Sequence, residues 1–254
     1  MKSFVDQFGY AIQTVADIRP AAELMRDAAA AMGGFRVAAL DNISTGSAML
    51  DEDGRDLSDS VFGWQARERW WVNGRALRMS PIIRACRYES EPFWVNAQGI
   101  YGPQASPYLE NIDPSDLEKL TSRRSVLIVP VHLPFARIGV AAFYPSDARD
   151  DLSDVYETYA DDLAVLVHRF IAGYAKVRRG QRQLPDDGGL TKREVECLHW
   201  AAVGKTDREI GMIISRSHAT VRFHIKNAAH KLDTVGRCHT IFKATQLGYL
   251  GIAQ

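Results

Sequence analysis

A short segment near residue 180 constrains the fold of this 254-residue chain more than any other feature. Residues 176–189 read KVRRGQRQLPDDGG, which is basic at first and then rich in proline and glycine, with few apolar side chains to bury. Segments of this composition join domains rather than form part of one. The sequence therefore predicts two domains, residues 1–175 and residues 190–254, connected by a linker of residues 176–189.

The two parts differ in charge. The formal net charge of the chain is zero, but residues 190–254 hold ten Lys and Arg against five Asp and Glu, or ten minus five, +5. The rest of the chain then carries −5. A small basic part attached to a larger acidic one indicates that the C-terminal part meets a polyanion.

The C-terminal part reads as short helices with no strand pattern. Thr191 and Glu194 form a capping box at the start of the first helix, and Gly204 can end that helix in a left-handed conformation. A second helix follows Thr206, and a third covers about residues 218–232 with Ser217 as its cap. The third helix has one apolar face and one polar, basic face. This pattern suits a helix-turn-helix in the major groove, but also an ordinary helical bundle with a solvated basic face.

A resemblance favours the first interpretation. The runs LTKREVECLHWAAVGKTDREIG (190–211) and SHATVRFHIKNAAHKL (217–232) closely resemble the LuxR-type helix-turn-helix, with Glu194, Leu198 and Gly204 at its hallmark positions. The resemblance implies binding to double-stranded DNA. It implies groove-facing roles for Thr220, Val221, His224, Lys226 and Asn227, and phosphate contacts for Arg222 and Lys231.

The N-terminal part mixes helix and strand patterns. The predicted helices are 18–32, one capped by Ser60 that includes Trp64, Trp70 and Trp71, one after Pro81, 115–122 and 153–177. The predicted strands are 35–40, 125–131 and 138–144, the last two joined by a turn containing Pro134. We expect an α/β/α sandwich here, so the whole chain is α+β: a sensor domain, a linker and a four-helix helix-turn-helix domain.

Asp41 stands alone after the first strand, so the acidic pair of a phosphorylated receiver is missing. Instead, residues 64–71, 79–82, 91–95 and 129–132 resemble the autoinducer-binding domain of quorum-sensing LuxR regulators. The resemblance implies that this domain binds a small signal molecule. It implies ligand contacts from Trp64, Arg67, Trp71, Ser80 and Trp94.

Some of these positions depart from the family pattern. Ser80 replaces an Asp, Trp71 a Tyr and Arg67 a Trp, whereas Trp94 matches. A hydroxyl makes a weaker hydrogen bond to a ligand amide than a carboxylate does. The predicted signal is therefore an acyl-homoserine lactone or a divergent compound. As alternatives, the tryptophans pack the core, and the domain is a ligand-independent dimerisation or partner-docking module.

The remaining features narrow the class of protein. Paired recognition helices read paired half-sites, so we expect a homodimer, with residues 153–177 as the dimer element. No nucleophile elbow, Walker loop, dinucleotide fingerprint or metal-spaced His/Cys cluster is present, so we expect no enzyme, cofactor or metal site. Three scattered cysteines are expected to be reduced thiols in or near cores. Apolar runs too short to span a bilayer, and a start without a signal-peptide pattern, predict a cytoplasmic protein without membrane association.

Overall fold

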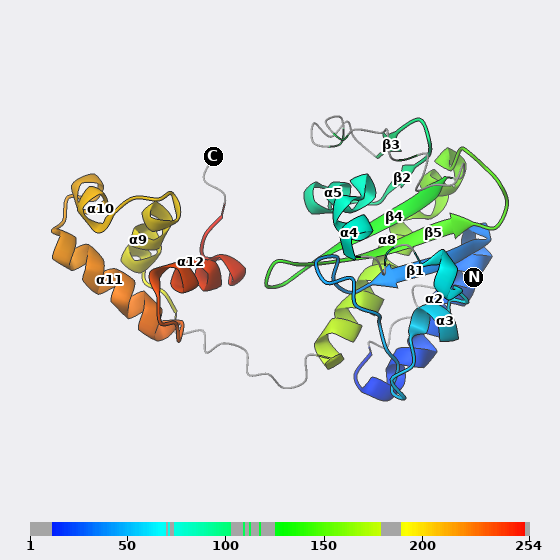
Figure 1. The fold of residues 1–254 in the computed structure, drawn as a ribbon, viewed down its shortest axis with the longest axis horizontal. Helices are drawn as coiled ribbons and strands as arrows, with labels where there is room; N and C mark the ends of the chain where they lie inside the picture. The colour runs from blue at the N-terminus through cyan, green and yellow to red at the C-terminus, as the bar shows by residue number, and fades with distance from the viewer. Residues whose placement is uncertain are drawn as a thin grey trace. The chain divides into compact units, whose positions relative to one another are not determined.

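The computed structural model of the protein describes residues 12–251 except 70, 72–73, 103–108, 110–111, 113–116, 118–124 and 179–188. The chain divides into two compact units, one ending at residue 180 and one formed mainly by residues 181–254 (Figure 1). The last helix of the first unit reaches Arg178, three residues beyond the predicted domain end. Most of the predicted linker lies outside the described residues.

A five-stranded antiparallel sheet forms the centre of the first unit, with strand order β1-β5-β4-β2-β3. The strands are β1 (Phe35–Leu40), β2 (Phe93–Val95), β3 (Ile100–Tyr101), β4 (Val126–Leu133) and β5 (Arg137–Pro145). Three of them, β1, β4 and β5, confirm the predicted strands. Strands β2 and β3 were not predicted, because two or three residues are too few to show an alternation pattern.

The helical elements of the first unit lie before, between and after the strands. They are η1 (Val15–Asp17), α2 (Ile18–Gly33), α3 (Leu57–Ser60), η2 (Ala66–Glu68), α4 (Gly74–Met79), α5 (Pro81–Tyr88) and α8 (Ser153–Arg178). Gly34, with φ of 64°, ends α2 in the left-handed conformation that glycine adopts most easily. The predicted helices 18–32 and 153–177 and the helix after Pro81 are confirmed.

These helices cover both faces of the sheet (Figure 1). Helices α2 and α8 pack together on one face, where a Cβ on Gly139 of β5 would meet the Ile171 side chain of α8 at 2.6 Å. Helices α4 and α5 cover the other face, and Leu77 and Ile82 lie against it. The predicted α/β/α sandwich is confirmed.

The aromatic-rich helix capped by Ser60 is a wrong prediction. Asp56, not Ser60, caps a helix here, accepting from the Ser58 amide, and that helix ends at Ser60. Trp64 lies outside any helix, and its indole donates to the backbone carbonyl of Val37. Trp70 and most of the predicted helix 115–122 lie outside the described residues.

The second unit is helical, with α9 (Lys192–Ala202), α10 (Asp207–Ile213), α11 (His218–Lys231) and α12 (Arg237–Gln246). The predicted caps are confirmed: Thr191, Thr206 and Ser217 each accept from the amide three residues on. Gly204 has φ of 91°, as expected for the end of the first helix. A separate core joins the four helices, formed by Cys197, Leu198, Ala201, Ile210, Val221, Ile225, Ala228, Leu232, Ala244 and Leu250.

Candidate functional site

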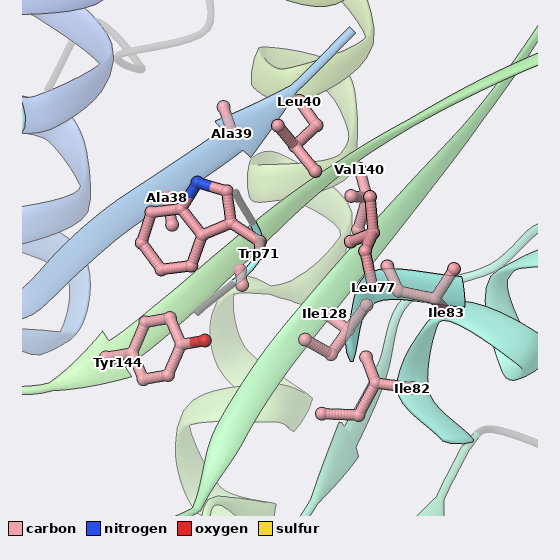
Figure 2. Close-up of a pocket in the computed structure, with 11 residues that line it drawn as sticks. Ala38, Ala39, Leu40, Trp71, Leu77, Ile82, Ile83, Ile128, Val140 and Tyr144 are labelled. Carbon is pink, nitrogen blue, oxygen red and sulfur yellow. The ribbon is translucent and has the colours of Figure 1, made fainter. Parts of the chain in front are cut away.

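An apolar cavity lies between the sheet and helices α4 and α5 (Figure 2). Strands β1, β4 and β5 line one side, and Leu77, Ile82 and Ile83 line the other. Small-molecule sites in proteins are mostly apolar, as this lining is. The first unit therefore contains a space suited to a small apolar molecule.

The cavity exists because small side chains stand where the sheet faces α4 and α5. Ala38 of β1 pairs directly with Ala142 of β5, and both line the cavity. Directly paired residues of antiparallel strands share a face, so two methyl groups lie side by side where larger side chains would fill the space. No period in the sequence distinguishes these alanines from those of an ordinary strand, and the sequence analysis missed them.

Two lining residues carry polar groups, Trp71 and Tyr144 (Figure 2). Trp64 packs edge-on against both rings, with centroids 5.3 Å from Trp71 and 5.1 Å from Tyr144. The Arg36 guanidinium lies 4.0 Å from the centre of the Trp64 ring on the same aromatic cluster. Trp64 thus supports the cavity wall, whereas Trp71 belongs to the lining.

Ser80 stands at the start of α5, between residues of α4 and α5 that line the cavity. Its side chain is buried, and its Oγ has no hydrogen-bond partner among the residues that the structure describes. A buried hydroxyl without a partner is costly, so this atom is suited to accept or donate a bond to a bound molecule. Ser80 itself is not among the lining residues.

Two predicted ligand residues are not brought to the cavity. Arg67 lies exposed on η2. Trp94 of β2 pairs with Leu127 and stacks on Tyr101, with ring centroids 4.2 Å apart. Ile128 lines the cavity from one face of the sheet, and the strand register places Trp94 on the other face. Trp94 therefore does not line this cavity, because a strand's side chains alternate between faces and the register decides which face each one takes. Its predicted contact with a ligand stays a prediction.

The second unit places α10 and α11 around a tight turn. Ser215 adopts φ of 54° there, and the Arg216 amide donates to the carbonyl of Gly211 at 2.8 Å. A Cβ on Gly211 would lie 2.6 Å from the Arg216 carbonyl oxygen. The backbones approach so closely that only glycine fits, which sets the geometry of the helix pair.

Helix α11 presents two different stripes away from the core. The fully exposed stripe contains Ala219, Arg222, Phe223, Lys226 and His230, at spacings of three, one, three and four. Beside it lies a half-buried stripe of Thr220, His224, Asn227 and Lys231. Of the predicted DNA-contacting residues, only Arg222 and Lys226 lie on the fully exposed stripe, and the sequence analysis missed Phe223 there.

Val221 is a wrong prediction. Its side chain is 0% exposed and packs in the core of the second unit, so it cannot reach a base edge. The apolar spacing of α11 places Val221 on the core face together with Ile225 and Ala228.

The Lys231 side chain makes hydrogen bonds within the second unit. Its ammonium donates to Glu194 Oε2 at 2.9 Å and to the carbonyl of Gly189 at 3.2 Å. Burial by itself would raise the pKa of Glu194, but hydrogen bonds from Thr191 and Lys231 outweigh it and lower the pKa. The pair joins α9 to α11, so Lys231 has a structural role, and its predicted phosphate contact stays a prediction.

Other site classes find no support in the described part of the chain. No group of three or more His, Cys, Asp or Glu side chains is placed there to hold a metal ion. None of the helices described is long and apolar enough to cross a membrane. Cys86 and Cys197 are buried, and burial raises the pKa of the Cys86 thiol to about 12, whereas Cys238 is exposed, contrary to expectation.

The protein thus consists of an α/β/α domain, which contains an apolar cavity, and a helix-turn-helix domain. Residues 189–244 match the model of the bacterial regulatory proteins of the luxR family. The second unit thus contains a luxR-family domain, and the relatives that match this chain are named as transcription regulators.

Individual relatives extend the match to varying degrees. The transcriptional activator protein LuxR of Aliivibrio fischeri is 33% identical over 119 residues, 47% of each chain. The quorum sensing-dependent regulator RpaR of Rhodopseudomonas palustris is 30% identical over 57% of this chain and 58% of its own, and the activator AhyR of Aeromonas hydrophila is 27% identical over 73% and 72%.

Against the LuxR proteins of Aliivibrio fischeri and VanR of Vibrio anguillarum, this chain spans about half of the relative's length. A solved structure, SdiA in complex with octanoyl-rac-glycerol, aligns over 98% of this chain and 95% of its own, with 17% identity and a TM-score of 0.49.

Proposed function

We propose that this protein is a transcription regulator that binds double-stranded DNA through α11 and is controlled by a small apolar signal bound in the cavity of its first domain. The observation that carries the proposal is the exposed basic stripe of α11 within a LuxR-family helix-turn-helix domain. The major groove admits one helix, and cationic side chains on that helix reach phosphates and base edges.

The α11 side chains that are most exposed to solvent are the proposed DNA contacts. Arg222 is 68% exposed and only loosely paired with Asp207, at 3.6 Å, so it can reach DNA without breaking a strong bond. Lys226 lies on the same stripe. Thr220, His224 and Asn227 stand on the flank of the helix and remain proposed secondary contacts.

Replacing Arg222 or Lys226 by Ala is expected to weaken operator binding about tenfold each and to lower the salt slope of binding by about one. The operator is first selected from a pool of random duplexes with the wild-type protein, and affinity is then measured by fluorescence anisotropy at several salt concentrations. Lys243→Ala on α12 removes the same charge from another helix as a control. Equal losses from all three variants would show only a general effect of charge and would contradict the assignment to α11.

The ligand part of the proposal follows from the cavity. Its lining is almost entirely apolar, with Trp71 and Tyr144 as the lining residues that carry polar groups. Ser80 joins α4 to α5, and its hydroxyl has no hydrogen-bond partner within the described part of the chain. These features favour an amphiphile with an acyl chain, such as an acyl-homoserine lactone or a neutral acyl ester. Since Ser80 stands where the family has Asp, we do not restrict the head group to the lactone.

Ala38→Leu and Ala142→Leu are each expected to weaken binding of an eight-carbon acyl probe at least tenfold, because they fill the cavity. N-octanoyl-homoserine lactone and octanoyl glycerol serve as probes, read by thermal shift, with native mass spectrometry for compounds that copurify. Ala66→Leu makes the same change at an exposed position and should bind as wild type does. If wild type binds neither probe and carries no copurifying compound, the domain is a dimerisation or partner-docking module instead.

We also propose that the regulator is a homodimer, because two recognition helices reading paired half-sites bind DNA more tightly than one. The predicted dimer role of α8 stays a prediction, and the apolar side chains of α8 are largely buried within its own domain, where α8 packs against β4, β5 and α2. The expected cytoplasmic location also remains a prediction.

A further inference from the structure

A phenylalanine stands at the centre of the exposed face of α11. Phe223 is 60% exposed, and its neighbours on the helix surface are Ala219, Arg222 and Lys226. At 100° per residue, Phe223 lies nearly opposite the direction of the core residues Val221, Ile225 and Ala228. Its ring contributes little to the core, although its edge contacts the His224 ring at 5.8 Å between centroids.

An aromatic ring in this position can contact an apolar group of a partner that Arg222 and Lys226 also bind. The major groove offers base edges that are polar throughout, with one apolar group, the 5-methyl of thymine. Arg222 and Lys226 flank Phe223 one residue before it and three residues after it, so phosphate or base contacts by these cations would hold the ring against the groove floor.

We propose that Phe223 contacts a thymine methyl and makes this regulator prefer thymine at one position of each half-site. The inference rests on the proposed DNA-binding function and deepens it, because it assigns a specificity-determining residue that the cationic contacts do not supply. Lys226 and Arg222 set the register of the helix, and Phe223 reads one base.

One small side chain beside the ring is consistent with a close approach. Ala219 stands one helical turn before Phe223 on the same stripe and leaves space beside it. A long side chain at position 219 would stand beside the ring and hold it away from the floor of the groove. The Phe223 ring thus projects from the centre of the exposed stripe, with the short Ala219 and the long side chains of Arg222 and Lys226 around it.

The experiment compares thymine with uracil, which differ by the 5-methyl group alone. A duplex selected from a random pool by the full-length wild-type protein has its half-site thymines replaced by deoxyuridine one position at a time. At one position, wild type should lose about fourfold in affinity, the factor expected for one buried methyl group, and about fifteenfold when both half-sites are changed. Phe223→Ala should bind the thymine and uracil duplexes equally at that position.

Phe242→Ala is the matched control, since Phe242 is 59% exposed on α12 of the same unit. Whatever its effect on affinity, it should keep the wild-type ratio of thymine to uracil binding. Phe223→Leu is a second variant that keeps an apolar contact and should retain part of that ratio if Phe223→Ala binds too weakly to measure.

The possible failures are distinct. If wild type selects no sequence at all, the DNA-binding function itself is wrong. If wild type selects a sequence but no thymine-to-uracil change alters its affinity, or if Phe223→Ala keeps the wild-type ratio, DNA binding stands and the role of Phe223 is overturned.

Discussion

Replacing Glu194 by Gln is expected to destabilise the C-terminal domain by about 3 kcal/mol. The carboxylate is 3% exposed, accepts from the Thr191 amide at 2.7 Å and pairs with Lys231 at 2.9 Å. Breaking a buried ion pair by removing one charge typically costs 3–5 kcal/mol, and Lys231, being partly exposed, recovers some of that from water. Hydrogen exchange of the α9 and α11 amides in the full-length protein, followed across urea concentrations, measures the change.

Glu209 is the matched control for this substitution. It forms the same capping box with Thr206, accepting from its amide at 2.8 Å, but it makes no ion pair in the described part of the chain. Glu209→Gln should cost less than about 1 kcal/mol, as the loss of a cap usually does. Equal costs at the two positions would mean that capping, and not the pair with Lys231, accounts for the effect.

The same pair predicts a dependence on pH. Since the pKa of Glu194 is lower in the folded than in the unfolded state, its contribution to stability is complete above the ordinary pKa of about 4.3. The contribution is lost as pH falls through the lowered pKa. The difference in stability between wild type and Glu194→Gln should therefore shrink as pH falls below about 4, and a difference that grows there would contradict the assignment.

Replacing Gly211 by Val is expected to unfold the helix-turn-helix locally and abolish DNA binding. A Cβ at this position would meet a backbone oxygen, that of Arg216, at 2.6 Å, and backbone atoms cannot turn aside as a side chain can. Overpacking costs typically 1–3 kcal/mol, and a β-branched side chain adds to that cost in this short helix. We expect a loss of about 3 kcal/mol in the same hydrogen exchange assay.

Gly211→Ala separates this clash from helix propensity. Alanine stabilises a helix interior by about 1 kcal/mol relative to glycine, so a net loss from Gly211→Ala would show that the close approach dominates. Gly236→Ala is the control, since a Cβ there meets nothing within 4 Å, and it should cost less than about 1 kcal/mol. A stabilised Gly211→Ala variant would show that the turn can relax, against the prediction.

Local rules account for most of what the sequence predicted correctly. The caps at Thr191, Thr206 and Ser217 depend on atoms within three residues, so they can be recognised without knowing the rest of the fold. The long helices α2 and α8 have enough residues to show a period, and the resemblance of residues 190–232 to a known helix-turn-helix added the expected function. The errors at Ser60 and Val221 arose where a composition cue or a resemblance was given more weight than local spacing.

The sequence by itself determined the two-part organisation, the long elements, the caps and the helix-turn-helix of this protein, because each of these depends on side chains close together along the chain. Only the tertiary structure decided the sites. Strand register put Trp94 on the opposite face from the cavity and brought Ala38 beside Ala142, 104 positions apart in the sequence. The packing of α9 against α11 joined Lys231 to Glu194 and left Phe223 facing outward. Contacts between distant residues depend on register and helix rotation, and a one-residue change in either reverses which side chains meet.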